Sequence, residues 1–352
     1  MTLAYDRAGA GPALVLLHGL GHRRQGWDAV RGRLTPHRDV ISVDLPGHGE
    51  SPPLRAGGQQ AVEVIAAQIA ALLSELGLSR PHLAGNSLGG TVALALAAQG
   101  RAASVTALSP AGFPGHDYEF YYDRVLFTLV RLTARGIGPL VPALSASVAG
   151  RALLYGAMVT RPGRITPEQA RGDVAGFAAA GEAMRAVFAG SMRFTAPVPD
   201  DVPVTIAWGT SDRVLPASNV RVARRQLPRA RFVPLPGCGH VPMTDDPDLV
   251  ARIVLAGSGT ATLFPVVSLP ASGRGEKRDS QIAPGWSLGH RSGMFLGASR
   301  SSADAYIRDL MVARVSPALP ACAAARSTAV ARTASSPAVR STIPAARASW
   351  PP

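Results

Sequence analysis

Short continuous apolar runs alternate with longer helical patterns over the first 256 residues, and this alternation constrains the fold more than any other feature. Continuous rather than alternating hydrophobicity is typical of strands that are covered on both faces. Strands and helices in alternation predict an α/β fold, with a mostly parallel sheet and helices on both faces. The apolar runs are ALVLLHG (13–19), DVISVDLPG (39–47), PHLAGNS (81–87), SVTALSP (104–110), VPVTIAWG (202–209) and ARFVPLPG (230–237).

Residues 112–197 break the alternation, because they contain no strong strand pattern. YEFYYDRVLFTLVRLTA (118–134) and TPEQARGDVAGFAAAGEAMRAVFAG (166–190) have the spacing of amphipathic helices. Thr166 is positioned to cap the second, with a proline in its first turn. We therefore expect a helical insertion at 112–197, between the two parts of a core formed by residues 1–111 and 198–256.

Residues 257–352 differ in composition from the rest of the chain. Leu, Ile, Val and Phe make up 17 of these 96 residues, which is below the roughly 20% that a packed core needs. We expect a low-complexity, mostly disordered tail, with one amphipathic helix at 302–315. A read-through extension and a partner-binding segment are the two hypotheses for its origin.

The net charge of +13 is unevenly distributed along the chain. Residues 1–256 carry 25 arginines and 19 acidic residues, whereas residues 257–352 carry 11 basic and 4 acidic residues. The chain contains a single lysine, Lys277. This arginine bias is more typical of genomic composition than of a phosphate-binding face, so we do not expect a nucleic-acid partner.

Cysteine and histidine usage argues against a disulfide framework and against a metal site. The chain has two cysteines, Cys238 and Cys322, and its eight histidines show no HExxH spacing. We expect neither a metal nor an organic cofactor. No stretch approaches the roughly 18 apolar residues of a membrane span. The first residues lack a basic segment followed by an apolar one, so the expected location is the cytoplasm; the oligomeric state stays open.

A serine between glycines occupies the junction between a predicted strand and a predicted helix. The segment Gly85-Asn86-Ser87-Leu88-Gly89 has the Gly-x-Ser-x-Gly spacing of a nucleophile elbow. The sharp turn strains the serine backbone, and Gly85 and Gly89 keep strand and helix from clashing. The turn exposes the hydroxyl at the end of the sheet, above the positive end of a helix.

Three further segments follow predicted strands and complete a catalytic hypothesis. HGLG (18–21) offers the backbone N–H of Leu20, which with that of Leu88 would stabilise an oxyanion. We expect His18 itself to bond locally to the backbone. Asp212 in WGTSDRVLP and His240 in LPGCGHVPM give the chain order Ser, Asp, His of a hydrolase triad. The alternatives are a capping aspartate and a surface histidine.

These motifs resemble, in order and spacing, those of the α/β-hydrolase superfamily, namely LLHGLG, DLPGHGES, GNSLGG, GTSDRVLP and GCGHVPM. The resemblance covers residues 1 to about 256. It implies that 112–197 is a helical cap and that Ser87, Asp212 and His240 form the triad. The dehalogenase and epoxide-hydrolase branches are disfavoured, because they use an aspartate where this chain has Ser87.

Other polar residues near the same sheet edge are candidate substrate contacts. These are His48, Asn86 and His116, with a surface role left open for His48. Asp44 is expected to fix the loop that follows it, and Cys238 to be a small packed residue rather than a nucleophile.

The apolar composition of the insertion favours a small, mainly apolar ester as substrate. Carbon–carbon bond hydrolysis, thioester hydrolysis, lactone or amide hydrolysis and cofactor-free peroxidase chemistry stay open, because the superfamily performs them with the same residue types. A non-catalytic ligand sensor on this scaffold is the alternative outside enzymology.

Overall fold

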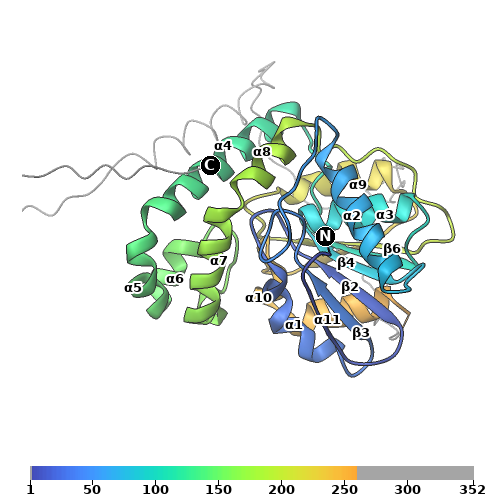
Figure 1. The fold of residues 1–352 in the computed structure, drawn as a ribbon, viewed down its shortest axis with the longest axis horizontal. Coiled ribbons are helices and arrows are strands. Elements are labelled where there is room, and N and C mark those ends of the chain that lie inside the picture. The colour runs from blue at the N-terminus through green and yellow to red at the C-terminus, as the bar shows by residue number, and fades with distance from the viewer. Residues whose placement is uncertain (1, 260–352) are drawn as a thin grey trace, which may run out of the picture. The chain divides into compact units, whose positions relative to one another are not determined.

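Seven strands form one sheet in the order β1-β3-β2-β4-β5-β6-β7, and Figure 1 shows it edged by helices. The computed structural model describes residues 2–259, which belong to one compact unit of the chain. β1 is antiparallel to β3, and every other neighbouring pair is parallel. The strands are Tyr5–Ala8 (β1), Ala13–Leu17 (β2), Asp39–Val43 (β3), His82–Asn86 (β4), Ser104–Leu108 (β5), Val204–Gly209 (β6) and Arg231–Leu235 (β7).

Helices connect these strands and also form a separate group between β5 and β6. The α-helices are Asp28–Leu34 (α1), Ala61–Glu75 (α2), Leu88–Ala98 (α3), Asp117–Gly136 (α4), Val141–Ala146 (α5), Val148–Tyr155 (α6), Pro167–Ala179 (α7), Gly181–Ala189 (α8), Val220–Gln226 (α9), Pro242–Asp245 (α10) and Pro247–Gly257 (α11). Short 3-10 helices are Arg24–Trp27 (η1), Gly138–Leu140 (η2), Pro162–Arg164 (η3) and Ala217–Asn219 (η4).

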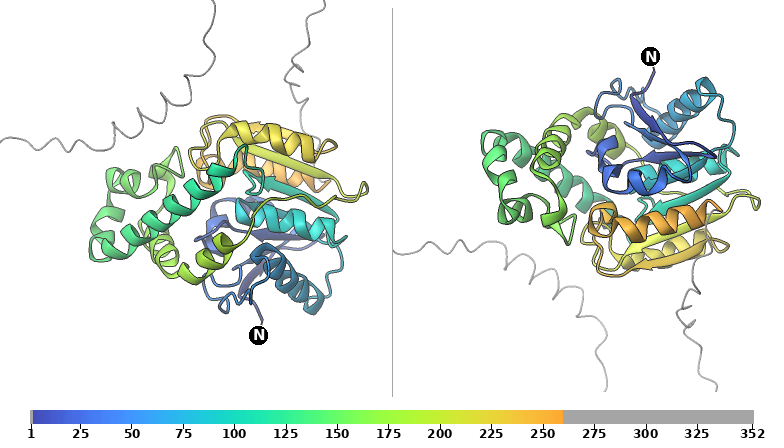
Figure 2. Two further views of the ribbon diagram at one scale, coloured as in Figure 1. Left: turned by 90° about the horizontal axis from the view of Figure 1, so that it is seen from above. Right: turned by 90° about the horizontal axis from the view of Figure 1, so that it is seen from below.

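The central strands bury both of their faces, which explains their continuous hydrophobicity. In β2, Leu14 and Leu16 belong to the core cluster that includes α1 and α11. Val15 and Leu17, which point to the other face, belong to the cluster that includes α2 and α3. Figure 2 shows helices on both sides of the sheet. The predicted α/β fold with a mostly parallel sheet is thereby confirmed.

Each apolar run that the sequence identified contains a strand, β2 to β7. β1 was not predicted. Its sequence, YDRA, has no apolar run, and its residues are half-buried or exposed at the sheet edge. Four ladder positions opposite β3 hold it in place. Backbone pairing at an edge leaves little trace in side-chain hydrophobicity.

Helices α4 to α8 lie together beside one end of the sheet, in green in Figure 1. Their shared core is aromatic, because Phe127 stacks on Phe177 with ring centroids 5.8 Å apart and contacts Phe188 at 5.9 Å. Thr166 caps α7 by accepting a hydrogen bond from the Gln169 N–H at 3.1 Å. The helix expected over 166–190 is divided in two at the buried Ala180, which ends α7 and precedes α8.

The last described helix extends slightly past the core boundary expected at residue 256. α11 ends at Gly257, and the Arg38 guanidinium donates to the carbonyl and the hydroxyl of the buried Ser258 at 2.6 and 2.9 Å. The predictions for residues 260–352 lie outside the described residues.

Within residues 2–259, the length and hydropathy required of a membrane-spanning helix are found in no single helix. A bent pair, Tyr118–Gly136 with Gly138–Ala146, meets them together by length and composition, with an angle of 66° between the two helices.

Candidate active site

The loops that carry the predicted site residues all leave the same edge of the sheet. Leu20 follows β2, Ser87 follows β4, Asp212 follows β6 and His240 follows β7. Because these strands are parallel neighbours, their carboxyl ends meet at one edge, which is where ligand sites form in open α/β sheets.

Ser87 forms the turn between β4 and α3 with an unusual backbone conformation. Its φ is 54° and its ψ is −118°, a region that residues with a side chain rarely adopt and that costs about 1–3 kcal/mol. The turn is held from β5, since the Ser87 N–H donates to the Leu108 carbonyl at 3.0 Å. The Ser87 carbonyl accepts from the Ala111 N–H at 3.2 Å.

The glycines on either side of Ser87 lie where no side chain fits. A Cβ on Gly85 would come within 2.2 Å of the Gly89 carbonyl oxygen. One on Gly89 would come within 2.3 Å of the Leu17 carbonyl oxygen, at the end of β2. The first turn of α3 can therefore approach β2 and β4 only because both positions are glycine.

Asp212 and His240 form a buried pair. The His240 Nδ1–H donates to Asp212 Oδ2 at 2.9 Å, and the carboxylate side chain is fully buried. The other carboxylate oxygen accepts from the N–H groups of Val214 and Leu215, each at 2.9 Å. These bonds fix the carboxylate and leave the lone pair of the imidazole on Nε2. Among the described residues, Nε2 has no hydrogen-bond partner.

Asn86 joins the serine turn to the histidine loop. Its side-chain amide donates to the His240 carbonyl at 2.9 Å and to the Leu108 carbonyl at 3.1 Å. The residue that we considered as a substrate contact thus holds two backbone segments together.

No hydrogen bond joins the Ser87 hydroxyl to His240 Nε2 in this structure. Catalytic hydrogen bonds are often long in the free enzyme and shorten when substrate binds.

A small cavity of about 20 Å³ lies directly at Ser87. It is lined by Leu20 and Leu88, the two residues whose backbone N–H groups were predicted to form an oxyanion hole. Leu88 begins α3, and the first N–H groups of a helix have no partner within the helix. The cavity therefore brings together the hydroxyl, the helix N-terminus and the loop after β2.

A larger cavity of about 340 Å³ lies beside it, between the loop after β5, the first half of α4 and the loop after α8. The two cavities share Ala111, Asp123, Met192 and Leu215. Its other lining residues include Phe113, Phe120 and Tyr121, so its wall is mainly apolar. A volume of this size holds a small organic molecule.

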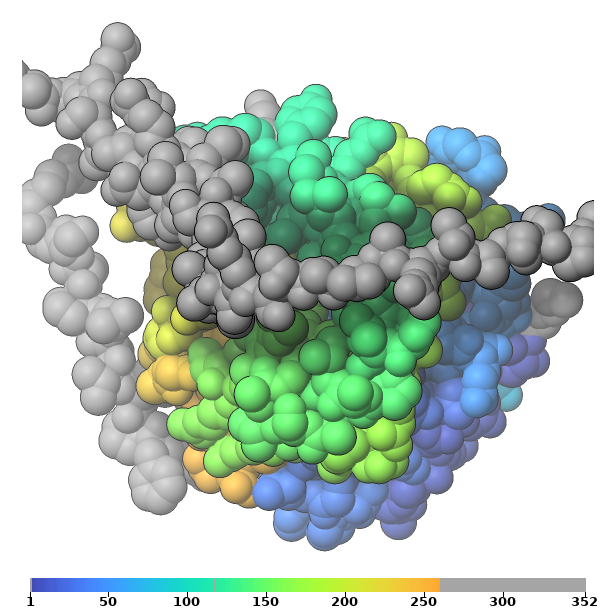
Figure 3. Space-filling model, turned by 90° about the vertical axis from the view of Figure 1, so that its left-hand side faces the viewer, coloured from blue at the N-terminus to red at the C-terminus, as the bar shows by residue number. Residues whose placement is uncertain are grey.

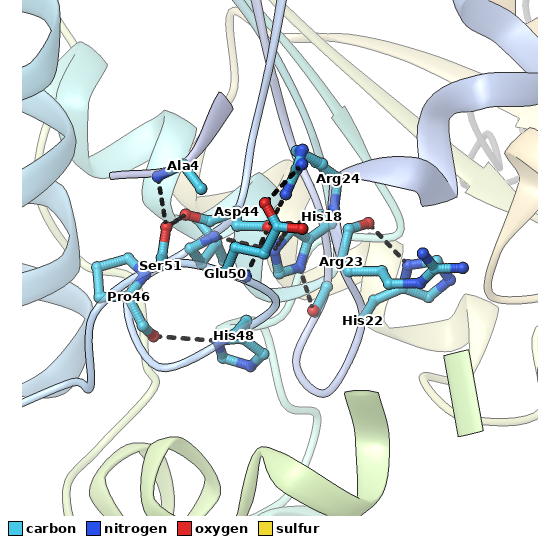
Figure 4. Close-up of polar contacts among 12 residues, drawn as sticks. Ala4, His18, His22, Arg23, Arg24, Asp44, Pro46, His48, Glu50 and Ser51 are labelled. Carbon is cyan, nitrogen blue, oxygen red and sulfur yellow. Dashed lines mark hydrogen bonds and ion pairs between the residues drawn. The ribbon is translucent and has the colours of Figure 1, made fainter. Parts of the chain in front are cut away.

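His18 serves the backbone, as the sequence indicated. Its Nδ1–H donates to the Gly19 carbonyl at 2.8 Å, and its Nε2 accepts from the Leu45 N–H at 2.9 Å. Both bonds are made by the neutral ring, and burial holds the pKa of His18 well below its usual value. Figure 4 shows His18 beside Asp44 and His48.

Asp44 organises the loop that follows β3, also as expected. Its buried carboxylate accepts from the Arg24 N–H at 2.6 Å, the Arg24 guanidinium at 2.5 Å and the Glu50 N–H at 3.0 Å. His48, in the same loop, is only 3% exposed, which excludes the surface role left open for it. Burial lowers the pKa of His48 to about 4. Its ring packs edge-on against His18, 5.2 Å between centroids (Figure 4), and it does not line either cavity.

The remaining sequence candidates lie away from the cavities. His116 is exposed at the start of α4, where its N–H donates to Glu119 Oε1 at 3.2 Å, and its ring stacks on Tyr118. Cys238 is buried, and burial raises the pKa of its thiol to about 11, which disfavours a nucleophilic thiolate. No group of three or more His, Cys, Asp or Glu within residues 2–259 is arranged to hold a metal ion.

Asp123 is the site residue that the sequence analysis missed. It lies on the buried side of α4, three residues after Phe120 and four before Phe127, and it lines both cavities. The available signal was an acidic residue at a core position of an amphipathic helix. Burial raises the pKa of this carboxyl to about 7, although His240 opposes the shift.

Comparison with known proteins identifies the family of this chain. The sequence profile of the alpha/beta hydrolase family matches residues 14–253, and the chain belongs to that family. It is 32% identical to an uncharacterised protein of Mycobacterium tuberculosis, over 71% of this chain and 77% of the relative. It is 31% identical to a pimeloyl-[acyl-carrier protein] methyl ester esterase of Xanthomonas axonopodis pv. citri, over 70% of this chain and 95% of that enzyme.

Among solved structures, the chain is similar to a membrane phospholipase A described as a bacterial virulence factor. The TM-score is 0.58 and the identity 28%, over 73% of this chain and 84% of that one. The chain's membership of this family, together with relatives that are named as esterases, identifies it as a hydrolase.

Replacing Asp123 with Asn should change how stability depends on pH. The pKa of Asp123 is raised on folding, so the native state binds a proton that the unfolded chain has lost between about pH 4 and pH 7. The free energy of unfolding therefore falls as pH rises through this range. We expect the free energy of unfolding of Asp123→Asn, relative to that of the wild type, to be higher at about pH 8 than at about pH 4.5. Denaturant unfolding at the two pH values measures this difference.

The groups that act on this carboxyl are His240, Glu119 and Asp212, and Arg193 lines the same cavity. All four are unchanged in the variant. An equal stability difference at both pH values would contradict the raised pKa.

Proposed function

We propose that this chain is a serine hydrolase that cleaves small, mainly apolar esters. The observation that carries the proposal is the Asp212–His240 pair, which engages the imidazole Nδ1 and leaves Nε2 without a hydrogen-bond partner at the sheet edge that bears Ser87. A buried imidazole in this tautomer can accept a proton, and the nearby strained serine is the group that would give it.

In the proposed first step, Ser87 Oγ attacks the ester carbonyl while its proton passes to His240 Nε2. Assistance of this kind accelerates a reaction by about 10²–10⁴-fold. Asp212 stabilises the resulting imidazolium through the bond to Nδ1, without itself taking the proton. The N–H groups of Leu20 and Leu88 bind the carbonyl oxygen as it becomes negative, and each such donor is worth about 2.7–4 kcal/mol.

The intermediate then collapses to an acyl-serine. The bond to the alkoxy oxygen breaks, and His240 returns its proton to the departing alcohol. In the second half, His240 accepts a proton from water, the hydroxide attacks the acyl-serine, and the proton returns to Ser87 as the acid leaves. The sequence of steps requires only groups that lie at this edge of the sheet.

Helices α4 to α8 fit the role of a cap over this edge. In this proposal residues 112–197 are the cap, and residues 1–111 and 198–256 are the catalytic core. The apolar 340 Å³ cavity lies between α4, the segments at the two ends of this cap, and Leu215 and Asn219 of the core. It adjoins Ser87, so it is the proposed site of the ester's larger substituent. The ester-hydrolase names of the Xanthomonas relative and the phospholipase A neighbour support an ester as substrate.

A fluorophosphonate probe should label the wild type on Ser87. Replacing Ser87 with Ala removes the nucleophile, so labelling should disappear and ester hydrolysis should fall by at least about 10³-fold. The measurement is probe fluorescence after gel electrophoresis, together with p-nitrophenyl butyrate turnover.

Ser109 provides the matched control. It follows the neighbouring strand β5, is buried and also has a positive φ, of 42°. Ser109→Ala should retain labelling. Loss of labelling in both variants would indicate damage to the fold, and labelling of Ser87→Ala would contradict the proposal.

The bond type can be established with a substrate panel. p-Nitrophenyl esters of increasing chain length should be cleaved, with a maximum at the length that fills the cavity. A thioester and a vinylogous 1,5-diketone serve as competitors. Faster turnover of the diketone or the thioester would identify that compound's bond, rather than the ester bond, as the one that is cleaved. Labelling of Ser87 without turnover of any of these substrates would favour a ligand sensor.

A further inference from the structure

Asp123 is buried in surroundings that do not satisfy a carboxyl group. It projects from α4 between Phe120 and Phe127 and is 8% exposed. Burying a charged or polar group without a partner is costly, so such groups are normally hydrogen-bonded. Within residues 2–259, no hydrogen bond or ion pair is formed by the Asp123 carboxyl.

A second acid lining the same cavity makes the contrast clear. Glu119, one turn earlier on α4, accepts hydrogen bonds from the N–H groups of Gly115 and His116 and from the side-chain amide of Asn219, at 3.0 to 3.2 Å. Its oxygens are therefore used to build the start of the helix. Asp123 makes no such hydrogen bond to the described residues, and the described group that favours its charged form is His240.

The position of Asp123 relative to Ser87 indicates what its partner is. It lines both the small cavity at Ser87 and the 340 Å³ cavity beside it. Any substrate that reaches from the serine into the larger cavity passes this carboxyl. A group that only accepts hydrogen bonds when ionised requires a donor from the ligand.

We propose that Asp123 is a specificity-determining residue that accepts a hydrogen bond from a hydroxyl group of the substrate, close to the scissile ester. The natural substrates are then hydroxylated esters rather than plain hydrocarbon ones. This inference rests on the proposed ester hydrolysis and refines it. A site built to bind a hydroxyl rejects the analogue that lacks it, because the buried acceptor is then left unpaired.

Matched ester pairs test this directly. One pair, p-nitrophenyl 3-hydroxybutyrate and p-nitrophenyl butyrate, places the hydroxyl on the acyl side. A second, 2-hydroxyethyl butyrate and propyl butyrate, places it on the alcohol side. For each pair the ratio of kcat/KM values is measured in the wild type, in Asp123→Leu and in Thr128→Leu, at about pH 8, where a carboxyl with a pKa of about 7 is ionised. Thr128 is an exposed residue on the same helix and serves as control. Intrinsic differences in ester reactivity cancel when ratios are compared between variants.

We expect the wild type and Thr128→Leu to prefer the hydroxylated member of at least one pair. Asp123→Leu should reduce that ratio by about tenfold or more, as expected for loss of a hydrogen bond to a charged acceptor. Ratios that agree within twofold in all three proteins would overturn the inference while leaving ester hydrolysis intact. Failure of the wild type to cleave any ester would instead refute the proposed function.

A different observation carries a second inference, about the outer surface of the helices. All nine large apolar side chains that are exposed among residues 2–259 lie within residues 118–153. Six of them follow α4 at helical spacing: Tyr118, Tyr121, Tyr122, Val125, Leu129 and Leu132, each 46–64% exposed. The other three are Leu140, Val148 and Leu153. Figure 3 looks onto these green helices. An exposed apolar stripe along one side of a helix is typical of an interaction site.

The charges around this apolar face indicate the partner. Residues 124–167 contain six arginines and no acidic residue, although Asp117, Glu119 and Asp123 precede them on α4. Of the six, Arg151 is buried, and Arg161 and Arg164 donate to the Asp245 carbonyl. Among these arginines, Arg124 and Arg135 are exposed on α4 itself. Tyrosine and leucine beside arginine are the composition of a helix that lies at the boundary between lipid headgroups and acyl chains. Tyr121 also lines the 340 Å³ cavity, so the face adjoins the site.

We infer that this face adsorbs to an anionic lipid surface. The test is co-flotation of the full chain with vesicles of phosphatidylcholine alone and with phosphatidylglycerol added. The variant is the double substitution Leu129→Asp with Leu132→Asp. The control, Ala67→Asp with Ala71→Asp, adds the same charge to exposed positions of α2. Circular dichroism checks the fold of each protein.

The wild type and the α2 control should float with the anionic vesicles, and the α4 variant should lose at least about tenfold in bound fraction. Equal flotation of the wild type and the α4 variant would overturn the inference, because the attraction would then come from elsewhere in this basic chain. No flotation of the wild type, or dimerisation that the α4 substitutions abolish, would also overturn it.

Discussion

The candidate site depends on the turn at Ser87, a residue with a side chain that is held at a positive φ. The nearby glycines, Gly85 and Gly89, lie where no side chain would fit. Ser87 can adopt φ 54° because Leu108 of β5 accepts from its N–H and Ala111, in the loop after β5, donates to its carbonyl, while α3 begins immediately after it. A Cβ at Gly85 or Gly89 would meet backbone oxygens at 2.2 and 2.3 Å. The strain is local, and the buried strands on both sides provide the packing that offsets it.

The same edge of the sheet supplies the partners of the serine. Parallel strands end together, so loops distant in sequence meet there. Asp212 is fixed by two backbone N–H groups and in turn orients His240. Asn86 then connects the serine turn to the histidine loop through the His240 carbonyl. A chain of hydrogen bonds thus links the loops after β4, β6 and β7.

The sequence allowed the fold and the position of this edge to be predicted, because both follow from local pattern. Strands buried on both faces have continuous apolar sequences, and each of the six apolar runs contains one of the strands β2 to β7. β1 could not be predicted because an edge strand is held by backbone pairing, and its sequence YDRA shows no apolar pattern. The break at Ala180 was missed because the apolar spacing of α7 and α8 continues across it.

Side-chain environments could not be predicted in the same way. His48 and Asn86 were candidates for substrate contact because of their loops, yet both are buried and bonded to backbone groups. Asp123 was overlooked, because whether an acid on a helix faces solvent or a cavity depends on which elements cover that helix. Only the packing of α4 over the loop after β5 places its carboxyl beside Ser87.

The central claim is that Ser87, His240 and the two leucine N–H groups act on one reacting carbonyl. A crystal structure of the chain inactivated with a small alkyl phosphonate tests it most directly. The account predicts phosphorus bonded to Ser87 Oγ, with the phosphoryl oxygen within about 3.2 Å of the N–H nitrogens of Leu20 and Leu88 and His240 Nε2 within hydrogen-bonding reach of the adduct. Phosphorus on another residue, or an adduct that His240 and both N–H groups fail to contact, would contradict it.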